Sequence, residues 1–195
     1  MSRTEGPTLR EQVSMALETH KSSDERERGF VERMKSLARG VEDPFSRASF
    51  EPGHFTASAF VLSPCGGRLL LILHSKLDLW LQPGGHIDET DSSLVDAARR
   101  EAQEETGLRG LRTVPSGAGL FDVDIHPIPA NRKKAEPAHE HFDLRFLFVS
   151  ESSELRAGSD ALAARWVPLD EVTDAGTDDS VLRALRKIAQ AEQRD

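Results

Sequence analysis

Three glutamates lie in one short stretch of this sequence at spacings that would place them on one face of a helix. Glu101, Glu104 and Glu105 fall in the segment REAQEETGL. On an exposed helix, like charges three or four residues apart repel by about 0.2–0.5 kcal/mol per pair, so the cluster works against its own helix. A divalent cation that prefers oxygen ligands, such as Mg²⁺ or Mn²⁺, would compensate. The spacing therefore predicts a metal site, with a solvated acidic helix as the alternative.

The residues around the glutamates suit such a site. Apolar periodicity predicts a helix over Leu94 to Thr106 whose carboxylates border the buried stripe. Arg100 lies one turn before Glu104, where its guanidinium can orient a ligand carboxylate. The glycine turn that ends at Gly85 can bring a backbone oxygen close to a cation, because no side chain stands in the way. Gly107 suits the left-handed conformation that commonly ends a helix.

The stretch GGHIDETDSSLVDAARREAQEETGL resembles the Nudix box, whose pattern is Gly, five residues, Glu, seven residues, Arg-Glu, an aliphatic, any residue, Glu-Glu, any residue, Gly and an aliphatic. The second half is matched by Arg100, Glu101, Ala102, Glu104, Glu105, Gly107 and Leu108. The first half departs, because Gly85 and Arg100 are one residue further apart than in the pattern. We expect Asp91 to replace the first glutamate, with the extra residue absorbed before the helix.

The resemblance covers roughly residues 50 to 193 and implies an α/β/α sandwich around a mixed β-sheet. We therefore expect a Nudix hydrolase domain over residues 49–195, preceded by a helical extension over residues 1–48. Family members typically hydrolyse a nucleoside diphosphate linked to another group and use Mg²⁺ or Mn²⁺. The implied partner is thus a small nucleotide substrate.

Site roles also follow from the resemblance. It implies that Gly85, Glu101, Glu104 and Glu105 hold the metal and that Glu101, Glu105 and Arg100 belong to the catalytic machinery. The base that activates water is either a box glutamate, Glu101 in some relatives, or a loop residue such as Glu140 in others. Both alternatives stay open from the sequence.

A second group of polar residues lies in the segment HEHFDLRFLF, which alternates as a strand does. His139, His141, Asp143 and Arg145 would share one face, and we expect that face to line the phosphate-binding cleft. One alternative is a surface strand whose polar side faces water. Another is a zinc site of His139 and His141, for which the sequence offers no third ligand of obvious spacing.

Three further residues surround the predicted hairpin and the glycine turn. His74, Lys76 and His86 are expected near the cleft and are predicted to bind substrate. Lys76 could hold a phosphate as a point charge, whereas Arg145 could do so as a two-pronged donor.

The remaining pattern predicts the elements that position these groups. Residues 1–48 carry two amphipathic helices, which are separated at KSSDE and end near Pro44. Their apolar stripes must be covered either by the chain's own domain or by a second subunit, and we expect a homodimer. HFTASAFVLS and RLLLILHS form a hairpin, and LWLQ, LFDVDI and ARWVPL read as strands. HPIPANRKKAEPAHEH reads as a long loop, and a last helix starts at Asp179.

Composition bounds the function further. The chain has 195 residues and a formal net charge of −8, which argues against a surface for long nucleic acid. Cys65 is the only cysteine, the start lacks the apolar core of a signal peptide, and no apolar run is long enough to span a membrane. We therefore expect a cytoplasmic protein that does not contact a membrane.

Two rival functions remain beside the hydrolase. One is a Nudix-like module that binds a nucleotide and regulates a partner without catalysis. The other is a Nudix-fold isomerase of an isoprenoid diphosphate, although no cysteine and glutamate pairing suits it. Among hydrolase substrates, ADP-ribose, a nucleotide sugar, a dinucleoside polyphosphate and a nucleoside triphosphate are all open.

Overall fold

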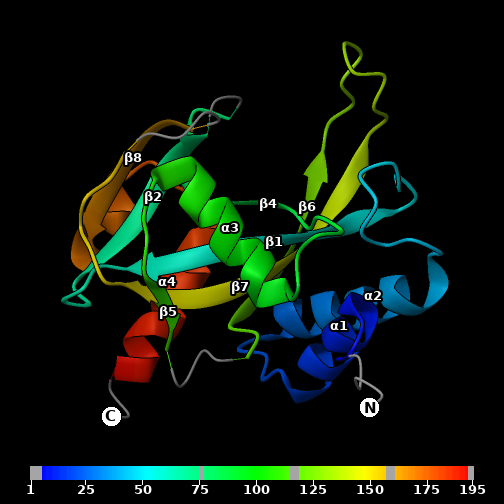
Figure 1. The fold of residues 1–195 in the computed structure, drawn as a ribbon, viewed down its shortest axis with the longest axis horizontal. Helices are drawn as coiled ribbons and strands as arrows, with labels where there is room; N and C mark the ends of the chain where they lie inside the picture. Colours follow the sequence, from blue (N-terminus) through cyan, green and yellow to red (C-terminus); the bar gives the residue numbers. More distant parts are fainter. Residues whose placement is uncertain (1–5, 75–76, 115–118, 157–160, 193–195) are drawn as a thin grey trace, which may run out of the picture.

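The computed structural model describes residues 6–74, 77–114, 119–156 and 161–192 (Figure 1). The elements in chain order are α1 (Leu9–Thr19), α2 (Glu25–Gly40), β1 (Gly53–Leu62), β2 (Arg68–His74), β3 (Leu79–Leu81), β4 (Gly84–His86), α3 (Leu94–Thr106), β5 (Leu111–Thr113), β6 (Asp122–Ile128), β7 (His139–Ser150), β8 (Ala161–Pro168), the 3-10 helix η2 (Leu169–Asp174) and α4 (Asp179–Glu192). Within these ranges, none of the helices combines the length and apolarity that crossing a membrane requires.

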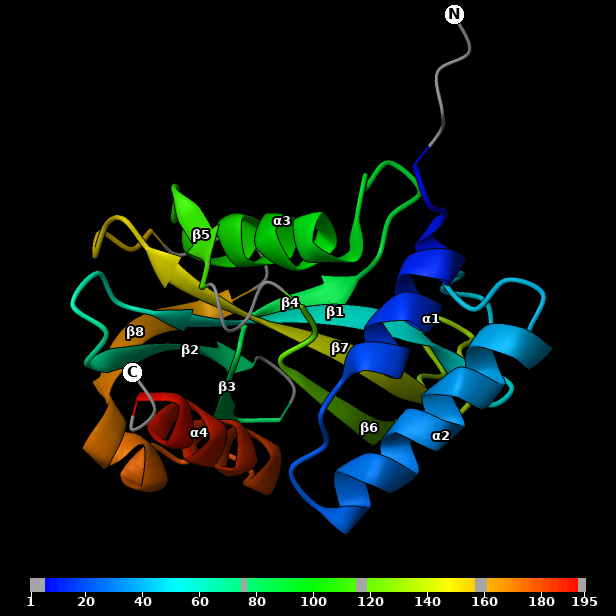
Figure 2. The ribbon, with the colours of Figure 1, turned by 90° about the horizontal axis from the view of Figure 1, so that it is seen from below.

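One mixed sheet of eight strands organises the molecule. Its main path runs β3-β2-β1-β7-β5, while β4 pairs with β1, β6 with β7 and β8 with β2. The long central pair β1 and β7 is parallel, and the other pairs are antiparallel. Helix α3 covers one face of the sheet and α4 lies against the other (Figure 2). The predicted mixed sheet between helical layers is confirmed.

Two hydrophobic clusters lie on the two faces of the sheet. Phe55 and Ala57 of β1 belong to the cluster that also contains buried residues of α1, α2 and α3. Phe60 and Leu62 of the same strand pack with α4, β2 and β8. This division follows from the alternation of side chains along a strand, so α3 and α4 contact different residues of β1.

The two predicted N-terminal helices are present, and their apolar sides are buried within the chain. Val13 of α1 and Met34 of α2 are fully buried in the cluster that includes α3 and β1. Helix α2 starts at the predicted break, where Asp24 caps it by accepting a hydrogen bond from the Glu27 N–H. It ends at Gly40 and not near Pro44, because glycine is a poor helix former and the next residue is extended.

Helix α3 has the predicted bounds, and both of its ends have a local cause. The Ser93 hydroxyl accepts a hydrogen bond from the Asp96 N–H and caps the first turn. At the other end Gly107 adopts φ 68°, the left-handed conformation predicted for it. The glutamates therefore lie on a helix that begins and ends at fixed positions.

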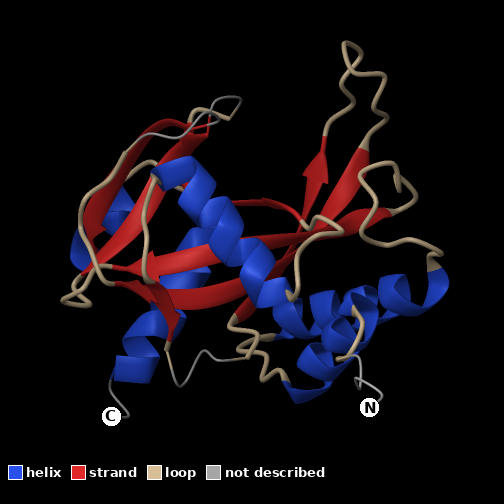
Figure 3. Cartoon of the chain, in the orientation of Figure 1, coloured by secondary structure: helices blue, strands red, loops and turns tan. Residues whose placement is uncertain are grey.

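The predicted long loop before β7 is shorter than expected. Strand β6 continues to Ile128, which pairs with His139 at the start of β7. An isolated bridge joins Asn131 to Glu136 beyond that pair. The two strands and their connection form an arm that extends from the body of the protein (Figures 1 and 3). Strand pairing thus replaces both ends of the predicted loop, and residues 129–138 still connect the two strands.

Candidate metal and catalytic site

Arg100 on α3 is the centre of the carboxylate cluster. Its Nε and Nη2 donate to the two carboxylate oxygens of Asp91, both at 2.9 Å. Nη2 also donates to the His86 carbonyl at 2.9 Å, and Nη1 donates to Glu101 at 2.9 Å and to Glu104 at 3.2 Å. The two-pronged contact shows that Asp91 does pair with the arginine despite the extra residue. One guanidinium thereby fixes the loop, the glycine turn and two glutamates together.

The glycine turn lies directly against the carboxylates of α3. A Cβ added to Gly85 would lie 2.6 Å from the Glu101 carboxyl carbon, so no other residue fits there without displacing that carboxylate. The Gly84 N–H donates to Glu105 at 3.0 Å, and a Cβ on Gly84 would lie 2.2 Å from the Ser58 hydroxyl oxygen. Both glycines are therefore required by close approach and not by an unusual φ.

The electrostatics of the cluster favour a bound cation. Burial raises the pKa of Glu101, and the neighbouring charges of Glu104 and Asp88 raise it further, although Arg100 opposes them. The Glu101 side chain is 13% exposed, whereas that of Glu104 is 57% exposed and can be reached from solvent. The donors are carboxylate oxygens, which suit Mg²⁺ or Mn²⁺. The residues present thus fit the predicted metal.

Four histidines gather on the opposite face of the sheet. His54 lies with its ring centroid 5.0 Å from His86, 5.2 Å from His139 and 4.9 Å from His141. Burial lowers the pKa of His86 to about 3 and that of His141 to about 2, so both rings are neutral. The structure therefore brings together three of the four histidines predicted to bind substrate, His86, His139 and His141.

Sequence reasoning missed His54 and also His126, whose ring is 5.5 Å from that of His141. The signal is the register of three neighbouring strands. His141 of β7 pairs with His54 of β1 on one side and with His126 of β6 on the other. Strand pairing places these three histidines side by side across β1, β7 and β6. No pattern within a single segment of the sequence indicates this pairing.

Asp143 and Arg145 lie in the protein interior. Each is 1% exposed, and Arg145 Nε donates to Asp143 at 2.7 Å. The arginine also contacts Asp122 at 3.3 Å and Asp124 at 3.4 Å. The predicted role of Arg145 in holding a phosphate does not fit this burial, because its donors face carboxylates of the chain. The alternative of a solvated edge strand is wrong as well, since β7 pairs on both sides.

Two of the other predicted residues, Glu140 and His74, do not belong to either of these groups among the contacts of the described residues. Glu140 is ion-paired with Arg33 of α2. Glu140 pairs with Gly53 of β1, whereas Gly85 pairs with Ala57 of the same strand. Gly53 and Ala57 are four residues apart, so at about 3.3 Å per residue Glu140 and Gly85 are separated by about 13 Å along β1. His74 ends β2, where it pairs with Leu79 of β3. Lys76 lies outside the described residues.

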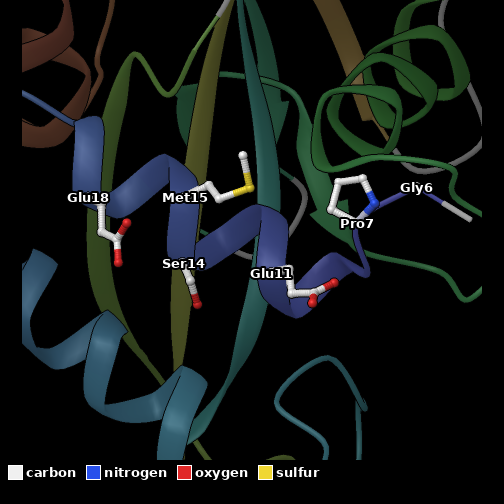
Figure 4. A pocket seen from close by; sticks show the side chains of 6 residues that line it. All are labelled: Gly6, Pro7, Glu11, Ser14, Met15 and Glu18. Carbon is white, nitrogen blue, oxygen red and sulfur yellow. The ribbon is translucent and has the colours of Figure 1, made fainter. Parts of the chain in front are cut away.

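A shallow hollow on α1 offers no comparable chemistry. Figure 4 shows the residues that line it: Gly6, Pro7, Glu11, Ser14, Met15 and Glu18. The Glu11 carboxylate accepts hydrogen bonds from the Thr8 backbone and hydroxyl, which lower its pKa and form a capping box. Its acid therefore stabilises the start of α1.

Comparison with known proteins agrees with the fold and the box. The family model described as NUDIX domain matches residues 53–185. A probable DHNTP pyrophosphohydrolase of Lactococcus lactis is 36% identical over 99 residues, which are 51% of this chain and 55% of that protein. A protein named Phosphatase NudJ from Escherichia coli is 36% identical over 133 residues, which are 65% of this chain and 74% of that protein.

Solved structures show the same architecture. A NUDIX-family hydrolase from Clostridium perfringens superposes with a TM-score of 0.52 at 26% identity and covers 71% of this chain and 97% of its own. Because the family model matches residues 53–185, more than half of the chain, the chain belongs to the NUDIX domain family. It spans about half the length of the Lactococcus relative.

Proposed function

We propose that this protein is a metal-dependent hydrolase that cleaves a phosphoanhydride in a nucleoside diphosphate linked to another group. The observation that carries the proposal is the set of carboxylates on α3. Arg100 donates hydrogen bonds both to these carboxylates and to the backbone next to the Gly84 and Gly85 turn. Mg²⁺ or Mn²⁺ would be held by Glu101, Glu104, Glu105 and the carbonyl oxygen of Gly85. A bound divalent ion neutralises charge on the phosphate oxygens and lowers the pKa of water.

The protein's own residues supply positioning and a base. Arg100 fixes the carboxylates of Glu101 and Glu104 through separate hydrogen bonds from Nη1. Glu101 is the proposed base, because burial raises its pKa toward the range in which a carboxylate can accept a proton from water. Glu140 is the weaker candidate, since Arg33 already pairs with it and it lies along β1 from the glycine turn.

The printed names of relatives support the reaction class. The Lactococcus relative is named a probable DHNTP pyrophosphohydrolase, and the Escherichia coli relative is named a phosphatase. Both names denote attack on a phosphorus centre. For this chain we propose a panel of ADP-ribose, nucleotide sugars, dinucleoside polyphosphates and nucleoside triphosphates as the substrates to screen.

The test is hydrolysis of that panel by Glu104→Gln and Glu105→Gln variants with saturating Mg²⁺. Each change removes an anionic ligand, and we expect turnover to fall by roughly 10²-fold or more, equivalent to about 3 kcal/mol of lost transition-state stabilisation. Glu18→Gln, which changes an exposed acid of α1, is the matched control and should keep full activity. Circular dichroism verifies that every variant folds.

Two outcomes would contradict the proposal. Near wild-type hydrolysis by both α3 variants would mean that the carboxylates are a solvated acidic face. Tight nucleotide binding without any metal-stimulated turnover in the wild-type protein would favour the regulatory module instead.

A further inference from the structure

The ring nitrogens of three histidines converge within the sheet. One nitrogen from each of His54, His139 and His141 lies within 4.8 Å of the other two. Among the residues that the structure describes, this is the group of histidine, cysteine and acidic side chains whose ligand atoms already meet in this way. His54 is 1% exposed and His139 is 9% exposed, so two of the three are enclosed by the fold.

Hydrogen bonds to the backbone fix which nitrogens are free. His54 Nδ1 lies 3.0 Å from the Ser49 carbonyl oxygen, and His139 Nδ1 lies 2.9 Å from the Pro137 carbonyl oxygen. A carbonyl only accepts, so both Nδ1 atoms carry a proton, and in the neutral ring Nε2 then presents the lone pair. Histidines that bind metals have this arrangement, in which the other ring nitrogen donates to a carbonyl.

His54 provides an independent observation in favour of the site. Its Nε2 is buried and has no hydrogen-bond partner among the described residues. A buried polar atom without a partner costs about 1–3 kcal/mol, so such atoms are rare unless something else satisfies them. His54 is also one of the three histidines whose ring nitrogens converge.

The donor set defines the class of ion. Imidazole nitrogens suit zinc, copper and nickel, whereas magnesium and calcium prefer oxygen. Zinc bonds to histidine at about 2.0–2.1 Å, so tetrahedral ligands lie about 3.3 Å apart. The three nitrogens therefore need to approach by about 1.5 Å at most, which small ring rotations can supply.

We propose that His54, His139 and His141 form a binding site for Zn²⁺, in which a fourth coordination position is open to water or another ligand. The site is separate from the carboxylates of α3. His54 and Ala57 point to opposite faces of β1, and Gly85, which pairs with Ala57, faces Glu101. The sheet itself thus separates the nitrogen site from the oxygen site.

The experiment measures metal binding to the purified full-length protein after treatment with a chelator. Zn²⁺ is titrated calorimetrically, and Co²⁺ is used as a spectroscopic substitute whose visible absorption reports tetrahedral nitrogen coordination. We expect one Zn²⁺ per chain, and we expect His139→Gln and His141→Gln each to weaken it by more than the roughly 10–100-fold that loss of an outer-shell partner costs.

Two control variants make the result specific. His126→Gln changes the histidine that contacts His141 from β6 but lies outside the converging group, and it should keep wild-type Zn²⁺ affinity. Glu104→Gln removes a carboxylate of α3 and should also leave Zn²⁺ binding unchanged. His54→Gln tests the buried ligand, with thermal unfolding in the absence of metal to show whether the variant folds.

The outcomes divide clearly. Loss of binding in the histidine variants together with retention in both controls supports the site. Absence of Zn²⁺ binding to the wild-type protein overturns the proposal, as does a loss in Glu104→Gln that matches the loss in His139→Gln. Because the readout is metal binding and not turnover, failure here leaves the proposed hydrolase activity untouched, and the converse also holds.

Discussion

At the scale of single residues, the candidate site depends on a glycine whose lack of a side chain leaves room for a carboxylate. Gly85 has no side chain, and this allows the Glu101 carboxylate to lie on the backbone of the turn. The same contact brings the backbone of the turn against the acid that the proposed reaction uses. A single added methyl group is therefore a sharp test of the geometry.

We predict that Gly85→Ala lowers turnover far more than it lowers stability. The new Cβ would meet the end of a flexible side chain, so Glu101 can rotate away and the free energy of unfolding should change by less than about 1 kcal/mol. A displacement of about 1 Å can cost about 10²-fold in rate, which is the loss we expect in turnover. Steady-state kinetics and thermal unfolding measure the two effects.

The matched control is Gly29→Ala in α2, where an added Cβ meets nothing within 4 Å. Alanine is favoured over glycine inside a helix by about 0.5–1 kcal/mol, so this variant should be slightly more stable and fully active. Gly85→Ala with wild-type turnover would show that the position of Glu101 does not matter for the reaction.

Much of the residue-level site could be predicted from sequence, because its members are local. The glutamates, Arg100 and the glycine turn lie in one continuous segment, and Asp91 was identified by counting along it. His54 could not be found in this way, because it meets His141 only through strand pairing. Contacts between distant segments require the register of the sheet.

At the scale of elements, a row of buried charges joins β6, β7 and α4. Arg183 of α4 donates to Asp122 at 2.8 Å, and Arg145 of β7 contacts the same carboxylate at 3.3 Å. On its other side Arg145 holds Asp143, which accepts hydrogen bonds from Thr56 and Ser58 of β1. The polar face of β7 therefore attaches strands and helix to one another.

We predict that Arg145→Met lowers the free energy of unfolding by about 3–5 kcal/mol, because it leaves buried carboxylates without a partner. Denaturant unfolding measures this change. Arg112→Met is the control, since Arg112 pairs with Glu151 at the surface with side chains 69% and 56% exposed. It should change stability by less than about 1 kcal/mol.

This pair of variants also tests the role first predicted for Arg145. A phosphate ligand would raise KM without destabilising the fold. Unchanged stability combined with a raised KM would restore that role and contradict the structural one. The alternation along β7 correctly predicted which residues share a face, but sequence alone does not tell that α4 covers the polar one.

At the scale of the whole molecule, the N-terminal helices are part of the main core. Their apolar residues pack with α3 and the sheet, and Glu27 of α2 forms an ion pair with Lys187 of α4. The chain's own domain thus covers the stripes that suggested a homodimer. The homodimer stays a prediction, but this packing does not require it.

We predict that Glu27→Gln destabilises the protein by about 3 kcal/mol at neutral pH, since Glu27 is fully buried and paired. Burial alone would raise the pKa of Glu27, but hydrogen bonds from His20, Lys187 and the Ser23 N–H outweigh it and hold the pKa well below its ordinary range. A lowered carboxyl pKa contributes stability above the unfolded value of about 4.3, and that stability is lost as pH falls below it.

Unfolding measured from pH 7 to pH 3 tests this directly. The wild-type protein should lose more stability below about pH 4.3 than the variant does. Glu32→Gln is the control, because Glu32 is 73% exposed in its pair with Lys35 and should behave as the wild type. Parallel curves for wild type and Glu27→Gln would mean that the buried pair contributes nothing to the acid response.

The parallel pairing of β1 with β7 also sets the order in which a newly made chain can fold. Thr56 of β1 and its partner Asp143 of β7 are 87 positions apart, and a ribosome adding about 5–20 residues per second needs about 4–17 s to span that interval. Throughout that time one edge of β1 has no strand beside it, because β2 and β4 pair with its other edge. The centre of the sheet can therefore close only after β7 has been made, so translation interrupted before His139 would release a product whose sheet lacks its middle.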